Sequence, residues 1–254
     1  MQKVFLFMVL IFMGFRGVAQ TEKITNGHFE IKYDKDVEAY ALGSVRILNL
    51  SWDKLNELGF KLPKKIKFNL VKSERDKLFV DKDKPIITLE YTSLDWSKTR
   101  PNFVYGLCHE MGHVCMFQIT PNKNNWMTID YREGWAHYFG GHMVVLLYEK
   151  FGDDMWYTPY NYLDQLTESI STLRTRTFEK GEDQNLGFLI STSFWEMLIN
   201  EKGIDKMPSF FRQIKSNGVR NPDAVKKFRV ELIKFGLSND LLDYFDRNHK
   251  YLIR

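Results

Sequence analysis

The stretch His109-Glu110-Met111-Gly112-His113 decides how this chain is interpreted. Two histidines four positions apart stand one above the other on the same face of a helix. From there both imidazoles can reach one metal ion at about 2.0–2.1 Å. Glu110 projects beside that face, where its carboxylate can take a proton from a water on the ion. The stretch therefore predicts a helix that supplies two metal ligands and a general base.

A catalytic zinc ion needs a third protein ligand and one open position. The metzincin pattern would place a glycine at position 116 and a histidine at 119, but this chain has Met116 and Ile119. The other large class takes a glutamate from the next helix, and Glu133 lies twenty residues after His113. The connecting loop is just long enough for that helix to fold back. We therefore predict that His109, His113 and Glu133 bind Zn²⁺.

These residues resemble the gluzincins, the thermolysin-like and aminopeptidase-like zinc peptidases of the peptidase MA type. Residues 133–139 (EGWAHYF) are similar to the E-G-x-A-x-Y-F stretch of smaller members, and residues 187–206 resemble the helix pair that follows it. The resemblance spans roughly residues 64–216. It implies a zincin-like fold and a zinc peptidase that hydrolyses peptide bonds, in which Glu110 activates a zinc-bound water. It also implies that a peptide or protein substrate pairs with an edge strand at residues 85–91.

Two features of the family pattern differ here. In thermolysin-like members an aspartate one turn after the glutamate ligand orients a histidine ligand, and this chain has His137 at that position. His137 is then a hydrogen-bond partner of a ligand, a fourth ligand of a closed site, or a bystander. The family also offers a tyrosine or histidine donor to the oxyanion. The candidates for that donor are Tyr157, Tyr160, Tyr162 and His142.

The main alternative function is a gluzincin-fold protein that binds zinc or a peptide without hydrolysing it. The intact Glu110 favours the enzyme over this alternative. No G-A-M-E-N-like exopeptidase motif precedes the metal helix, which argues against aminopeptidase activity of the large-family kind.

Hydropathy patterns predict an α+β fold. Alternation of apolar and polar residues predicts strands at 31–33, 65–71 and 85–91, and helical periodicity predicts a long amphipathic helix at 36–58. The metal helix is expected from Pro101 or Asn102 to about residue 119. A second helix is expected from about 128 to 139, kinked or broken at Gly140-Gly141 and resuming at 143–151. Further helices are expected at residues 160–175, 186–201, 206–215, 222–234 and 239–245.

These elements predict one domain at 21–254, which the resemblance implies is catalytic. A small mixed N-terminal sheet with the long helix extends to about residue 120, and an all-helical half covers 121–254. The metal helix lies at their junction. The only cysteines, Cys108 and Cys115, are seven apart on that helix. Their Cα atoms are then about 10.5 Å apart. A disulfide needs less than about 7 Å, so both are expected to be small buried residues.

Residues 1–20 have the pattern of a signal peptide. Lys3 precedes an uncharged run at 4–15, and small residues follow at 17–19. The run is shorter than the roughly twenty residues that span a bilayer. We therefore expect export, as a secreted or periplasmic protein, without stable membrane insertion. The net charge of +4 is too mild, and the lysines too scattered, to predict a nucleic-acid partner.

Overall fold

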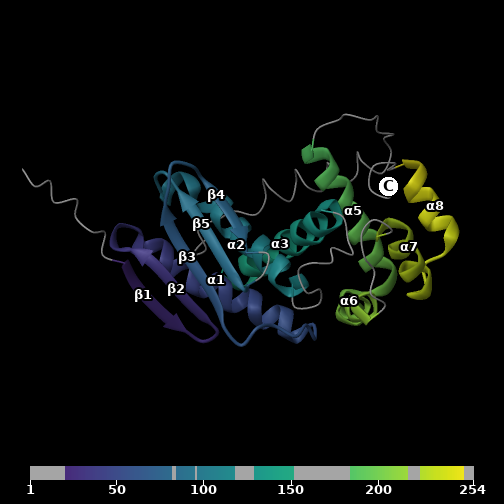
Figure 1. The fold of residues 1–254 in the computed structure, drawn as a ribbon, viewed down its shortest axis with the longest axis horizontal. Helices are drawn as coiled ribbons and strands as arrows, with labels where there is room; N and C mark the ends of the chain where they lie inside the picture. The colour runs from purple at the N-terminus through teal and green to yellow at the C-terminus, as the bar shows by residue number, and fades with distance from the viewer. Residues whose placement is uncertain are drawn as a thin grey trace, which may run out of the picture.

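A computed structural model describes the chain over the stretches 21–81, 84–94, 96–117, 129–151, 184–216 and 224–248. The fold is α+β, as the sequence predicts, with the sheet in the N-terminal part and only helices in the stretches described after residue 95 (Figure 1). Within the described stretches no helix combines the length and the apolar character needed to cross a membrane.

Five strands form a mixed sheet in the order β1-β2-β3-β5-β4. They are β1 Thr21–Asn26, β2 Phe29–Asp34, β3 Ile66–Lys72, β4 Lys77–Val80 and β5 Ile86–Tyr91. The inner pairs β2–β3 and β3–β5 are parallel, and the outer pairs are antiparallel. The three predicted strands are confirmed as β2, β3 and β5. The sequence analysis missed β1, which has no buried residue, and β4, which has only four residues.

The prediction that residues 85–91 form an edge strand is wrong. β5 lies between β3 and β4, and β4 takes the edge. The backbone N–H of Asp81 donates to the carbonyl of Ile86 at 2.8 Å. Because hydrogen bonding alternates along an antiparallel pair, Leu78 and Val80 direct their backbone groups away from β5, toward the open side of β4. Among the described residues no strand pairs with that side.

One face of the sheet is buried under α1 (Glu38–Glu57) and α2 (Trp96–Phe117). Alternate residues of each inner strand lie on that face, including Ile31, Phe68 and Leu89, while Lys32 and Lys67 on the other face are exposed. This is the period-2 pattern of a half-buried sheet. The predicted long helix is confirmed as α1, preceded by a 3₁₀ turn.

Helix α2 begins at Trp96, before the predicted start at Pro101 or Asn102. Pro101 is the sixth residue of α2, past its first turn, so it removes one i→i−4 hydrogen bond but does not mark the start of the helix. Both cysteines are free and buried on this helix, as predicted. Burial raises the pKa of Cys108 to about 12, and the hydroxyl of Ser51 donates to its sulfur at 3.7 Å. These thiols are therefore unreactive packing residues.

The sequence analysis expected a kink or a break at Gly140-Gly141, and the break is wrong, because α3 runs without interruption over Ile129–Phe151. A Cβ atom at Gly140 would lie 3.0 Å from Cε2 of Tyr105 and 3.2 Å from the backbone nitrogen of His109. Gly140 therefore permits a close approach of α3 to α2. A glycine inside a helix costs only about 0.5–1 kcal/mol relative to alanine, which tertiary packing offsets.

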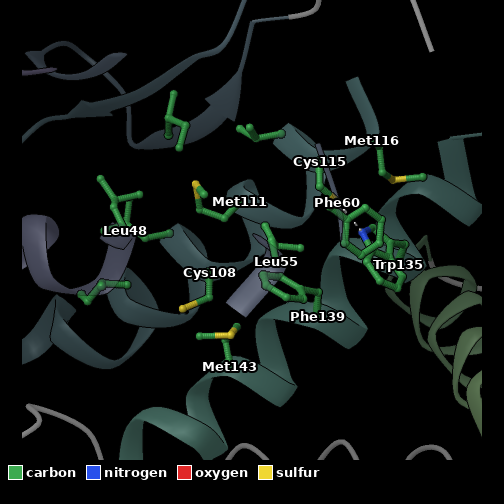
Figure 2. Packing of buried hydrophobic residues seen from close by; sticks show 14 of the residues in the cluster. Leu48, Leu55, Phe60, Cys108, Met111, Cys115, Met116, Trp135, Phe139 and Met143 are labelled. Carbon is green, nitrogen blue, oxygen red and sulfur yellow. Dashed lines mark hydrogen bonds between the residues drawn. The ribbon is translucent and has the colours of Figure 1, made fainter. Parts of the chain in front are cut away.

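Gly112 makes a second close approach, because a Cβ atom there would lie 3.0 Å from Cα of Ala136. Beside it, Nε1 of Trp135 donates to the Gly112 carbonyl at 3.1 Å. Figure 2 shows the buried core here, where the Trp135 ring lies beside Phe60 and Cys115. The two glycines set the separation of the helices that carry the predicted ligands.

Gly112→Ala is expected to destabilise the protein by up to about 2.5 kcal/mol. The new methyl group meets backbone, which cannot rotate away, and overpacking costs about 1–3 kcal/mol. Alanine offsets only about 0.5–1 kcal/mol of this through helix propensity. Urea unfolding measures the difference. An increase in stability would show that the crossing of α2 and α3 accommodates the added methyl group without strain.

The C-terminal half is helical over its described stretches, as predicted. Its helices are α5 Gln184–Lys202, α6 Met207–Ser216, α7 Ala224–Lys234 and α8 Asn239–Asn248, with a 3₁₀ turn at Ile204–Lys206 before α6. Trp135 of α3 packs edge-on against Trp195 of α5 and Phe211 of α6, at ring-centroid distances of 5.4 and 5.1 Å. The helix predicted at 160–175 lies outside the described residues.

Candidate metal centre

The structure brings the three predicted ligands together at the crossing of α2 and α3. His109 and His113 are one turn apart on α2, and Glu133 lies near the start of α3. Nε2 of His113 is 3.1 Å from Nε2 of His109. Oε2 of Glu133 is 3.3 Å from each of these nitrogens. The two nitrogens and the oxygen form a nearly equilateral triangle.

This triangle has the size that one small metal ion requires. Three donors at about 2.0–2.1 Å from an ion, at tetrahedral angles, are about 3.3–3.4 Å apart. Two imidazoles and a carboxylate are ligands that zinc and related divalent metals accept. The side chains are largely buried, with 12% of each histidine and 23% of Glu133 exposed. Among the described residues this is the group of side chains placed to hold a metal ion.

The charges of the ligands suit a cation. Burial would raise the pKa of Glu133, but hydrogen bonds from His109 and His113 hold it well below its usual range. Burial lowers the pKa of His109. Burial acts the same way on His113, but the hydrogen bond to Glu133 and the charges of Glu110 and Glu133 together raise its pKa. The centre therefore offers an ionised carboxylate beside two imidazoles.

Glu110 is 6% exposed and lies beside the ligands without joining the triangle. Burial raises its pKa to about 7, the charge of His113 opposes the shift, and that of Glu133 adds to it. The backbone N–H of Val80 donates to its carboxylate, so edge strand β4 lies against this residue. Glu110 and Glu133 are thus two neighbouring carboxylates with pKa values displaced in opposite directions, as expected for different chemical roles.

His137 lies one turn after Glu133 and contacts a ligand. Its ring centroid is 4.5 Å from that of His109, with the rings nearly edge to face. Its Nδ1 atom forms a short hydrogen bond with the hydroxyl of Tyr105. His137 is not in the ligand group, whose atoms lie within 4.8 Å of one another. Burial, with the nearby His109, lowers its pKa to about 3. These contacts place the His137 ring against a ligand, while its Nδ1 atom bonds to Tyr105 rather than to a ligand.

The sequence analysis missed Tyr105. It lies one turn before His109 on α2, and helical periodicity alone would have placed it on the ligand face. Helical periodicity does not predict the hydrogen bond between Tyr105 and His137 of α3.

The structure does not bring His142 to the metal centre. Nine residues along α3 separate it from Glu133, which corresponds to about 13.5 Å of helix and the opposite side. Its ring instead stacks on Tyr138 at 6.3 Å. The other three oxyanion candidates lie outside the described residues. They are Tyr157, Tyr160 and Tyr162.

A hollow between α1 and α3 lies apart from this centre. Its volume is about 390 Å³, and its lining includes Leu50, Asp53, Met143 and Leu147 but none of the three ligands. The chemistry of the molecule is therefore sought at the triangle, where donor atoms and a buried carboxylate converge.

Together these residues define a candidate single-ion metal centre shared by two helices. The chain matches no protein-family model, and no curated protein is significantly similar to it.

Proposed function

We propose that this chain is an exported zinc-dependent peptidase of the gluzincin type with a zincin-like fold. The observation that carries the proposal is the triangle of His109, His113 and Glu133 with buried Glu110 beside it. When bound there, zinc acts as a Lewis acid that polarises the scissile carbonyl and acidifies water. Export is proposed from the signal-like pattern of residues 1–20.

Glu110 acts as the general base. Its carboxylate removes a proton from the attacking water and returns it to the amine nitrogen as the C–N bond breaks. A group serves both steps best when its pKa is near the working pH, and burial raises the pKa of Glu110 to about 7. A cation on the neighbouring ligands lowers that pKa and favours the basic form.

The edge strand β4 suits a peptide substrate. The Leu78 backbone groups and the Val80 carbonyl face its open side, where the Val80 N–H already donates to Glu110. An extended peptide that pairs with β4 by β-augmentation passes beside the general base and the ligands. This assigns to β4 the role that the sequence analysis gave to residues 85–91.

The test is metal analysis of the purified chain, followed by digestion of a mixed peptide library. The proposal expects near-stoichiometric zinc and cleavage that stops with a chelator and returns with added zinc. Absence of zinc after gentle purification would exclude the metal site. Stoichiometric zinc without cleavage would support the alternative, a protein that binds zinc or a peptide without hydrolysis.

Chelation of zinc is expected to lower the thermal midpoint by roughly 5–15 °C. Zinc at 100–1,000 times its Kd stabilises the folded state by about 2.7–4.1 kcal/mol. For a chain of this size each 1 kcal/mol shifts the midpoint by about 2–4 °C. The ligands join two helices, so the ion links α2 to α3. Circular dichroism melts with and without chelator measure the shift, and an unchanged midpoint would contradict the link.

A further inference from the structure

The hydrogen bond between Tyr105 and His137 joins the same two helices that the metal ligands join. Tyr105 is on α2, one turn before His109, and His137 is on α3, one turn after Glu133. The bond and the ligand triangle are therefore neighbouring cross-links at one crossing. The proposed metal centre does not use this bond, although it lies one helical turn away.

Three rings pack around this crossing. The Tyr105 and His137 rings are nearly parallel, with centroids 6.0 Å apart. The His109 ring lies 4.5 Å from His137 and 5.9 Å from Tyr105. Nε2 of the His109 imidazole therefore lies at the triangle, and the same ring packs against the Tyr105–His137 pair.

The His109 ring lacks the usual hydrogen bond that orients a metal ligand. A ligating histidine usually donates its second ring N–H to an acceptor, which fixes the orientation of the ring. Among the described residues Nδ1 of His109 is buried and has no such partner. The orientation of the His109 ring then depends on the rings packed against it.

The lack of a side chain at Gly140 leaves room for the Tyr105–His137 pair. A Cβ atom at this position would lie 3.0 Å from Cε2 of Tyr105. The Tyr105 ring therefore lies against the α3 backbone at Gly140. Its hydroxyl forms a hydrogen bond with His137, which is also on α3. The absence of a side chain at Gly140 and the presence of this hydrogen bond are thus parts of one arrangement.

We infer that Tyr105 and His137 are positioning residues that hold the His109 imidazole in its metal-binding orientation. This inference rests on the proposed metal centre. Neither residue binds the ion: their hydrogen bond keeps the two rings in place against His109 and fixes the separation of α2 and α3 beside the triangle. Outer partners of metal ligands typically contribute about 10–100-fold to metal affinity.

The experiment measures zinc Kd by competition with a chelating dye, for the parent chain and five variants. Tyr105→Phe removes one oxygen and keeps the ring, so it tests the hydrogen bond with little risk to folding. His137→Ala removes both bond and ring, and His137→Asn keeps a hydrogen-bonding group near the position of Nδ1. The double variant of Tyr105→Phe with His137→Ala tests whether the two residues act together. Tyr138→Phe is the matched control, because it removes a hydroxyl from a neighbouring residue of α3 that packs on Trp135 and His142.

We expect zinc Kd to rise about 10-fold for Tyr105→Phe and 10–100-fold for His137→Ala. The double variant should bind like His137→Ala, since both changes remove one bond, and His137→Asn should recover part of the affinity. Tyr138→Phe should bind like the parent. The visible absorption of the cobalt-substituted protein reports ligand geometry, and it should change for Tyr105→Phe but not for Tyr138→Phe.

Parent-like zinc affinity and cobalt spectra in both Tyr105→Phe and His137→Ala would overturn the inference and leave the metal centre intact. Equal losses in Tyr105→Phe and Tyr138→Phe would overturn it as well, because they would indicate a general packing effect. Failure of the parent itself to bind zinc would overturn the proposed function, which separates the two failures.

Discussion

Replacing Glu110 by glutamine is expected to lower kcat/KM for peptide hydrolysis by about 10²–10⁴-fold, with zinc content unchanged. Glutamine has nearly the same shape and can still accept a hydrogen bond from the Val80 N–H. It cannot take a proton from water at neutral pH. Because Glu110 lies outside the ligand triangle, the substitution leaves the three donors in place. Cleavage of a peptide library and metal analysis of the same samples provide both measurements.

Glu231→Gln is the matched control for this substitution. Glu231 is a buried glutamate on α7, 3% exposed and paired with Gln213 and Lys234. Its change to glutamine is expected to lower stability while leaving kcat/KM of the folded protein unaltered. If the parent and Glu110→Gln hydrolyse peptides equally well, Glu110 is not the base. If neither cleaves any peptide although both bind zinc, the alternative of a non-hydrolytic binding protein gains support.

The grouping of His109, His113 and Glu133 was the most predictable part of this structure. The spacing of His109 and His113 fixes their geometry once a helix forms, because helical pitch places i and i+4 on one face. Glu133 was predictable from the length of chain between it and His113, which permits one fold-back of α3. Both inferences use local geometry, and local geometry is what a sequence encodes most directly.

The features that the sequence did not reveal depend on neighbours distant along the chain. Gly140 has the intrinsic tendency to interrupt a helix, yet α3 continues through it. Tyr105 and His109 of α2 occupy the space where a side chain at position 140 would stand, so close packing of the two helices requires glycine there. The packing of α2 therefore overrides the propensity of α3. No pattern within residues 128–151 contains that information.

Strand β4 illustrates a different limit. Four residues offer too little alternation to predict a strand, and its pairing with β5 then changed which strand forms the edge. Because β4 pairs with β5, the proposed peptide-binding edge is β4 and not β5. Similarly, Tyr105 and His137 were visible as residues, but their hydrogen bond exists only because two helices cross closely.

Replacing Glu133 by alanine is expected to weaken zinc binding by about 10²–10³-fold. Structural zinc sites with four ligands bind with roughly 10–16 kcal/mol, or about 2.5–4 kcal/mol for each ligand. Glu133 supplies one vertex of the triangle, 3.3 Å from each histidine nitrogen, and its carboxylate would balance part of the charge of a bound ion. Glu133→Asp, which withdraws the carboxylate by one methylene group, should lie between parent and alanine. Competition with a chelating dye measures all three affinities.

Glu133→Ala separates a two-helix centre from a pair of histidines on one helix. Glu201→Ala is the control, since it removes an equal charge from an exposed position on α5. If the ion joins α2 to α3, the lowering of the thermal midpoint by chelator should nearly vanish in Glu133→Ala and persist in Glu201→Ala. Parent-like zinc affinity in Glu133→Ala would assign the metal to α2 alone. The triangle would then be a hydrogen-bonded contact between helices, and the peptidase proposal would lose its third ligand.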